Sequence, residues 1–234
     1  MSKATEIIKN THYPKLLIKF PTRSRVVKFF NTLDIYYKLL SNKCDVEFLI
    51  TCDNDDLSMN NSTVRDRFKT YSNLEVEYGD SQTKIEAINT GVSQRNFDII
   101  LLASDDMIPV VSGYDLIIIN KMRENFPDFD GILWFNDGLQ QERLNTLCIL
   151  GRPYYNRFNY IYNPEYKSLW CDVEFTQVGY LLKKQKYFNQ TIIKHNHYSV
   201  INEDADVLYT KNDMDNDVDK ITYLKRYTNN FYLC

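Results

Sequence analysis

The stretch Phe97-Asp-Ile-Ile-Leu-Leu-Ala-Ser-Asp-Asp-Met-Ile-Pro109 decides the fold. Five of the six residues from Ile99 to Ser104 are apolar, which predicts a strand buried on both faces of an α/β sheet. Asp105 and Asp106 follow where that strand emerges, and open α/β sheets bind ligands at the carboxyl ends of their strands. Two carboxylates there suit a divalent cation and the phosphates it carries. An Asp-rich turn after a strand is the alternative interpretation of the same residues.

Outward from this stretch, strand patterns alternate with helix patterns. Strands are predicted at 15–20, 46–51, 74–78, 97–103 and 131–135, and helices at 26–40, 62–71, 83–93 and 114–125. This alternation predicts one α/β domain with a doubly wound, mostly parallel sheet and helices on both faces. After about residue 140 the periodicity weakens. The segment 202–219 has the composition of an acidic loop, and a short helix is expected near 220–227.

Size and composition narrow the class of protein. The 234 residues suffice for one sizeable core, and a net charge of −3 argues against a broad nucleic-acid-binding face. The five cysteines are odd in number and lack C-x-x-C spacing, which indicates free thiols in a reducing compartment. No signal peptide or run of about 18–20 apolar residues is present. We therefore expect a cytoplasmic protein, soluble or peripherally associated with a membrane, without a nucleic-acid partner.

The seven glycines lie too far apart to form G-x-G-x-x-G or G-x-x-x-x-G-K. This spacing excludes a dinucleotide-binding fingerprint and a P-loop. A bound nucleotide diphosphate would have to be neutralised by a cation on the Asp105–Asp106 pair, helped by Arg23, Arg25 or Lys84. A sugar nucleotidyltransferase would also need a Gly-rich loop after the first strand, and residues 21–25 contain no glycine.

Over about residues 15–200, the chain resembles the nucleotide-diphospho-sugar glycosyltransferases of the GT-A fold, particularly family-2-like members. The turn Phe20-Pro-Thr-Arg-Ser-Arg25 is similar to the segment that frames the nucleotide base. Thr51-Cys-Asp-Asn-Asp-Asp56 is similar to the strand end whose Asp binds that base. Lys84-Ile-Glu-Ala-Ile-Asn-Thr-Gly91 resembles the helix before the metal-binding strand. The resemblance implies that the nucleotide sugar is bound by Pro21, Thr22, Arg23, Arg25, Asp53, Asp55, Lys84, Asn89, Ser104 and Asp105.

Ala103-Ser-Asp-Asp-Met107 stands at the position of the family's metal-binding D-x-D. Because Ser104 replaces the first Asp, the resemblance assigns the metal to Asp106 first and Asp105 second. Of the pair in His195-Asn-His197, it favours His197 as a further ligand. The implied cofactor is Mn²⁺ or Mg²⁺.

The second half of the chain is expected to bind the acceptor. Trp134-Phe-Asn-Asp-Gly138 resembles an acceptor-side loop, with Trp134, Asn136 and Asp137 as its candidate residues. In Trp170-Cys-Asp-Val-Glu-Phe175, Asp172 is the preferred catalytic base and Glu174 the second candidate. A helix cap is the alternative role for Asp172.

The resemblance implies transfer of a sugar, with inversion, from a nucleotide diphosphate sugar, UDP-sugar favoured, to a hydroxyl of a glycan or glycoconjugate. Residues 15–110 would form the nucleotide-sugar half, 111–200 the acceptor and catalytic half, and 201–234 a C-terminal tail. A nucleotidyltransferase and a non-catalytic nucleotide- or sugar-binding module of the same fold remain the alternatives.

Overall fold

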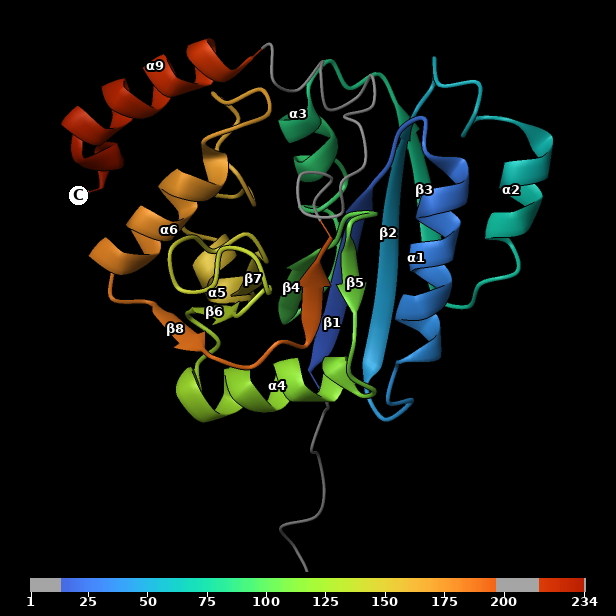
Figure 1. Ribbon diagram of the computed structural model, residues 1–234, viewed down its shortest axis with the longest axis horizontal. Helices are drawn as coiled ribbons and strands as arrows, with labels where there is room; N and C mark the ends of the chain where they lie inside the picture. The colour runs from blue at the N-terminus through green and yellow to red at the C-terminus, as the bar shows by residue number, and fades with distance from the viewer. Residues whose placement is uncertain (1–13, 197–214, 234) are drawn as a thin grey trace, which may run out of the picture.

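A computed structural model describes residues 14–196 and 215–233. Its centre is a seven-stranded sheet in the order β3-β2-β1-β4-β7-β6-β8 (Figure 1). The strands of this sheet are β1 (Lys15–Pro21), β2 (Asp45–Asp53), β3 (Leu74–Gly79), β4 (Ile99–Leu102), β6 (Ile132–Phe135), β7 (Ile149–Gly151) and β8 (Gln185–Phe188). A separate antiparallel pair consists of β5 (Met107–Pro109) and β9 (Ile193–His195).

The sheet is mostly parallel, as the sequence predicts. β1 pairs in parallel with β2 and with β4, so Leu16 lies opposite both Val46 and Ile99. β2 and β3 are also parallel, as are β6 and β8. β7 runs antiparallel to both of its neighbours, β4 and β6. This strand is the exception to the predicted parallel order.

Helices cover both faces of the sheet and divide the core into two layers. They are α1 (Val26–Lys38), α2 (Ser62–Phe68), α3 (Lys84–Asn89), α4 (Tyr114–Asn125), α5 (Arg152–Tyr155), α6 (Cys171–Leu181) and α9 (Asn216–Thr228), followed by a 3₁₀ turn at Asn230–Tyr232. Side chains alternate along β1, so Ile18 and Phe20 pack with residues of α1, α2 and α4. Leu17 points the other way and packs with residues of α3, α5 and α6. The predicted doubly wound α/β domain is confirmed.

Several short elements do not stand out in the sequence. β5, β7, β8 and β9, each of three or four residues, were not predicted. The expected acidic loop ends earlier than proposed, since α9 begins at Asn216 and includes Asp217 and Asp219. No helix in residues 14–196 and 215–233 combines the length and apolar character that crossing a bilayer requires.

Candidate active site

Polar residues gather at the carboxyl edge of the sheet, where β1, β2 and β4 end. Two adjoining cavities open there, enclosing about 1000 Å³ and about 950 Å³ with their solvent-open mouths included. Pro21, Lys84, Ser104 and Asp106 line both of them. The Asp105–Asp106 pair therefore lies beside a hollow at the edge of the sheet where the sequence places it.

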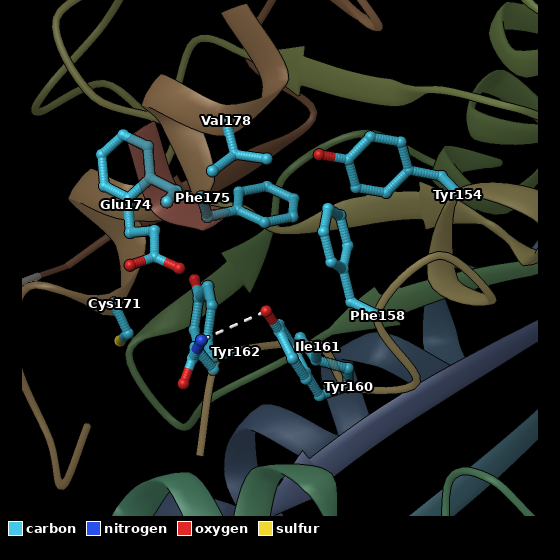
Figure 2. A pocket seen from close by; sticks show the side chains of 11 residues that line it. Tyr154, Phe158, Tyr160, Ile161, Tyr162, Cys171, Glu174, Phe175 and Val178 are labelled. Carbon is cyan, nitrogen blue, oxygen red and sulfur yellow. Dashed lines mark hydrogen bonds between the residues drawn. The ribbon is translucent and has the colours of Figure 1, made fainter. Parts of the chain in front are cut away.

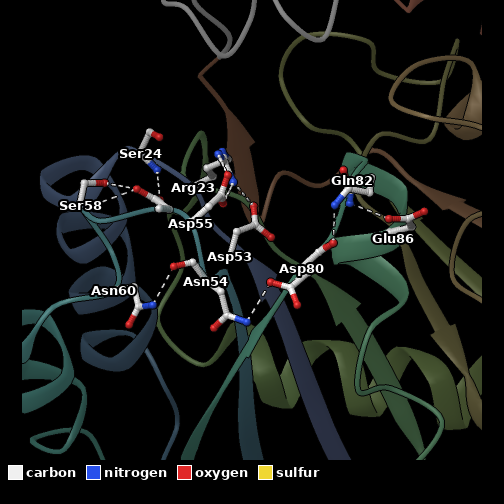
Figure 3. A network of polar contacts seen from close by, with 11 residues as sticks. Arg23, Ser24, Asp53, Asn54, Asp55, Ser58, Asn60, Asp80, Gln82 and Glu86 are labelled. Carbon is white, nitrogen blue, oxygen red and sulfur yellow. Dashed lines mark hydrogen bonds and ion pairs between the residues drawn. The ribbon is translucent and has the colours of Figure 1, made fainter.

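The first cavity gathers most of the residues predicted for the nucleotide sugar. Its lining includes Pro21, Thr22, Arg23, Arg25, Asp53, Lys84, Ser104, Asp105 and Asp106. Arg23 Nη1 donates to Asp53 Oδ2 at 2.7 Å, and the same guanidinium makes two bonds to the exposed Asp55, at 2.6 and 2.8 Å (Figure 3). Asp55 does not line the cavity itself, but it contacts Arg23, which does. The wall presents a carboxylate and a guanidinium side by side.

Asn89 does not line either cavity. Its side-chain amide donates to the carbonyl of Tyr162 at 2.7 Å and accepts from the N–H of Ile161 at 2.9 Å. Asn89 therefore holds the 161–162 segment, and only indirectly supports the second cavity, which Tyr162 lines.

Asp105 and Asp106 have different partners although they are adjacent. Arg25 Nη1 lies 3.1 Å from Asp105 Oδ1, and the hydroxyl of Thr32 donates to the Asp105 carbonyl at 2.9 Å. Burial raises the pKa of Asp105, while Arg25 opposes that shift. Asp106 accepts a hydrogen bond from the Ser104 hydroxyl, and it alone of the two carboxylates lines the second cavity.

His195 lies between Asp106 and Asp137. The antiparallel pairing of β5 with β9 sets Met107 opposite His195, which brings the imidazole next to the Asp pair. Its Nε2 is 3.6 Å from Asp106 Oδ2, and its Nδ1 is 3.5 Å from Asp137 Oδ2. Burial disfavours the charged imidazole, but the two carboxylates outweigh it and raise the pKa of His195 to about 9.

Asp137 is buried behind His195 and is held in a fixed position. Burial opposes its charge, but the neighbouring His195 imidazole and hydrogen bonds from the Thr146 hydroxyl and from backbone amides hold its pKa below the usual range. The Thr146 bond measures 2.6 Å, and the amides of residues 139–141 donate to Oδ1 at 2.7–3.1 Å. A carboxylate behind an imidazole orients the ring and selects which nitrogen faces outward. Here Nε2 is the nitrogen that faces Asp106.

Asp106 and His195 are the two described side chains that could hold a divalent cation at the second cavity. Mg²⁺ and Mn²⁺ in nucleotide sites commonly use one or two protein ligands and complete their shell with phosphate oxygens and water. The described ranges contain no cluster of three or more His, Cys, Asp or Glu side chains with metal-ligand spacing, so the substrate would have to supply the rest. His197, the histidine that the sequence analysis favoured, lies outside the described residues.

Asp172 lies in the first turn of α6 and lines the second cavity with Asp106 and His195. Burial raises the pKa of Asp172, and the nearby charge of Lys84 opposes this shift. The Asp172 carboxylate also accepts a bond from the N–H of Val173 at 2.9 Å. Trp170 is the N-cap of α6, so Asp172 is not the N-cap residue that the alternative interpretation supposed.

Glu174 points into a different, smaller cavity lined largely by aromatic rings (Figure 2). It accepts a bond from the Tyr166 hydroxyl at 2.7 Å and forms an ion pair with Arg226 at 2.7 Å. Residues two apart on a helix are rotated by about 200° around its axis, so their side chains lie on nearly opposite faces. Asp172 and Glu174 therefore do not share a cavity, and the structure brings only Asp172 to the candidate site.

The residues predicted on the acceptor side lie outside both cavities. The indole of Trp134 donates to the carbonyl of Gln141 at 3.0 Å, and the amide of Asn136 donates to Asn189 at 2.9 Å. β7 accounts for this difference, because it separates β6 from β4 and moves the end of β6 away from the Asp pair. Only Asp137 reaches the site, through His195.

Several residues that line the cavities were not chosen from the sequence, and four of them carry groups that bear on the chemistry. His195 and Thr146 border the second cavity, and Lys167 and Asp215 border the first. His195 is separated from Asp106 by 89 positions, and only the unpredicted β5–β9 pair brings them together.

Comparisons with known proteins place this architecture among solved glycosyltransferases. No protein-family model matches the sequence, and no curated protein sequence matches it. The mannosyltransferase PcManGT from Pyrobaculum calidifontis, in complex with GDP-Man and Mn²⁺, matches 77% of the chain with a TM-score of 0.58 and 14% identity. S. aureus TarS 1-349 matches 78% with a TM-score of 0.60 and 15% identity, and its UDP complex matches 77% with the same TM-score and 14% identity.

The matched region is 56% of the PcManGT chain and 60% of TarS 1-349, so this chain spans little more than half the length of these proteins. At such low identity the likeness concerns the fold. The chain has the GT-A-like fold of nucleotide-sugar glycosyltransferases.

Proposed function

We propose that the chain is a metal-dependent glycosyltransferase that moves a sugar from a nucleotide diphosphate sugar to a hydroxyl of a glycan or glycoconjugate. One observation carries the proposal: Asp106, His195 and Asp172 line a single cavity at the carboxyl edge of the sheet. An acid–base carboxylate beside a cation site is the combination that glycosyl transfer to a hydroxyl needs. The fold supports the same reaction class but does not set the substrate.

The base of the donor would lie in the first cavity, against Asp53 and Arg23. A carboxylate accepts the ring N–H of a base, and a guanidinium donates to a ring carbonyl. Arg23 engages Oδ2 of Asp53, which suits a base with one ring N–H, such as uracil, better than guanine with its two adjacent donors. We therefore favour a UDP-sugar, although GDP-Man is bound by PcManGT and UDP by TarS.

Arg25 and Lys84 line the first cavity and would bind the donor's phosphate oxygens. Asp106 and His195 would hold Mn²⁺ or Mg²⁺, and the imidazole favours the softer Mn²⁺. When bound, the cation would act as a Lewis acid that stabilises the charge of the departing diphosphate. For His195 to serve as a ligand, its Nε2 must lose the proton that the two carboxylates favour.

Asp172 would accept the proton of the attacking acceptor hydroxyl, a role worth about 10²–10⁴-fold in rate. Attack on the face opposite the leaving group would invert the anomeric centre. Residues 15–110 would serve the donor and residues 111–200 the acceptor and the base.

We propose that the reaction takes place in the cytoplasm. Four cysteines, Cys44, Cys52, Cys148 and Cys171, are free, and free thiols persist in that reducing compartment.

Binding of nucleotides tests the donor site without any acceptor. The melting temperature would be measured with UDP, GDP, CDP, TDP and ADP, each with Mn²⁺ or with EDTA. A ligand at 100 times its Kd stabilises the native state by about 2.7 kcal/mol. We expect the largest increase with UDP and Mn²⁺, and we expect Asp106→Ala to remove its Mn²⁺-dependent part. The matched control Asp66→Ala alters an exposed carboxylate and should keep the full shift. A protein that responds to no diphosphate would contradict the proposal.

A further inference from the structure

The first turn of α6, which carries Asp172, is fixed from outside the helix. Its N-cap residue, Trp170, has a left-handed backbone with φ of 63°. Helices usually begin with a Ser, Thr, Asp or Asn whose side chain accepts one of the first N–H groups. In the part of the chain that the structure describes, no side-chain hydrogen bond caps α6 in this way. Other contacts must therefore hold the segment 167–170 that leads into the helix.

Asp219 of α9 supplies the main contact. Its carboxylate is fully buried and accepts three backbone hydrogen bonds, from Lys167 at 2.9 Å, Ser168 at 2.8 Å and Leu169 at 2.7 Å. Hydrogen bonds to an ionised acceptor are roughly twice as strong as those between neutral groups. One side chain, fifty residues away in sequence, thus anchors three consecutive amides.

The same helix contacts the two ends of the segment. The indole of Trp170 donates to Asn216 Oδ1 at 3.0 Å, and its ring lies 5.3 Å from that of Tyr223. At the other end, the ammonium of Lys167 is 3.7 Å from Asp215, just before α9. Figure 1 shows α9 running above α6 at this end of the molecule. Every residue from 167 to 170 therefore contacts the start of α9.

The anchored segment also forms part of the candidate site. Ser168 and Leu169 line the second cavity together with Asp172. On the far side of Asp172, Glu174 forms its ion pair with Arg226, again from α9. α9 thus fixes α6 on both sides of the Asp172 carboxylate.

We propose that Asp219 is a positioning residue for the general base: by anchoring the amides of residues 167–169 it sets where Asp172 stands in the cavity. This inference rests on the proposed glycosyltransferase function. Asp219 lines neither of the two cavities, so it would act on Asp172 through the segment that it holds. Misplacing a reacting group by about 1 Å can reduce a rate by about 10²-fold.

The test compares Asp219→Asn with Asp217→Asn, an exposed position on the same helix. Hydrogen exchange of the amides in 167–171 would be followed by mass spectrometry, alongside kcat and KM for release of nucleoside diphosphate. We expect Asp219→Asn to accelerate exchange of these amides at least tenfold and to reduce kcat by about 10- to 100-fold. KM for the donor should change less than threefold, and Asp217→Asn should match the wild type throughout.

Faster exchange with an unchanged kcat would overturn the inference, because Asp219 would then serve only the fold. Unchanged exchange would overturn it as well, since the anchor would not depend on this carboxylate. If Asp219→Asn does not fold, Asn216→Ala, which removes the contact to Trp170, carries the same comparison with a smaller expected loss of kcat. A wild-type protein that turns over no nucleotide sugar would refute the proposed function itself. In that case the exchange data alone would still show whether Asp219 anchors the amides of residues 167–169.

Discussion

Burial shifts the protonation of two side chains of opposite charge, Asp172 at the candidate site and Lys19 in the sheet. In both cases the environment favours the neutral form. The shift at Asp172 concerns the proposed chemistry, whereas the shift at Lys19 concerns the stability of the fold. Each has a consequence that can be measured at the scale of one residue.

The raised pKa of Asp172 predicts the pH dependence of catalysis. A general base must be ionised, so kcat should fall as the pH drops through a pKa above the usual Asp value of about 4. Lys84→Met removes the charge that opposes the shift and should move this acidic limb to higher pH. Asp172→Asn should lower kcat by about 10²–10⁴-fold while UDP still raises the melting temperature. A limb near pH 4, unaffected by Lys84→Met, would argue against Asp172 as the base.

Lys19 is fully buried in β1, and its ammonium donates to Thr51 Oγ1 at 3.0 Å and to the Thr90 carbonyl at 2.8 Å. Burial lowers its pKa to about 7 from the ordinary 10.5. Between these values the unfolded chain binds more protons than the native one, so stability rises with pH. From pH 7 to pH 9 this group should add about 2 kcal/mol to the free energy of unfolding.

Urea unfolding at both pH values checks this prediction, with Lys19→Met as the comparison. The variant lacks the titrating group, so its stability should gain about 2 kcal/mol less than the wild type over that interval. Equal gains in the two proteins would show that the Lys19 pKa is not shifted.

At the scale of elements, the insertion of β7 decides which strand ends meet. Gly151 closes this strand, and a Cβ placed there would lie 1.8 Å from the carbonyl oxygen of Phe129. Gly151→Ala should therefore destabilise the protein by about 1–3 kcal/mol or more, because backbone would have to move. Gly79→Ala is the matched control, since its Cβ meets no atom within 4 Å and should change stability by less than about 0.5 kcal/mol. The free energy of unfolding of both variants would be measured by chemical unfolding. Equal losses of stability would show that the close approach of Gly151 to Phe129 does not require glycine.

The sequence predicts the elements whose apolar pattern is long enough to read. Apolar runs predict β1, β2 and β4, and helical periods predict the helices between them. These elements in turn predict the sheet edge where Asp53, Asp105 and Asp106 lie. β7 could not be read because it has three residues, Ile149–Gly151, with no room for alternation. The predicted acceptor loop at Trp134 was therefore placed one strand too close to the site.

The candidate site was likewise predictable where it follows strand ends and not where it depends on pairing. The choice of His197 over His195 had no local signal, because residues two apart on a strand differ only in the face they occupy. The pairing of β5 with β9 brings His195 to Asp106. The separation of Asp172 from Glu174 required a helix that begins at Cys171, which the sequence pattern does not mark with an ordinary cap.

For the whole molecule, the fold brings groups from distant parts of the sequence to one edge of one sheet. β4 ends at the Asp pair, β9 adds His195, α6 adds Asp172, and α9 holds α6 in place. The first cavity gathers charged side chains, and the second, which shares Asp106 with the first, adds Asp172, the proposed general base. This arrangement supports the proposal that the donor binds in the first cavity and that the base acts from the second.

Release of nucleoside diphosphate from nucleotide sugars tests the central claim most directly. The wild type, Asp106→Ala, Asp172→Asn and the control Asp66→Ala would be incubated with UDP-sugars and GDP-mannose in Mn²⁺ or EDTA. We predict Mn²⁺-dependent release, fastest with a UDP-sugar, by the wild type and Asp66→Ala, and at least 100-fold slower release by the two site variants. Full activity of Asp106→Ala and Asp172→Asn, or no release by the wild type from any donor, would contradict the account.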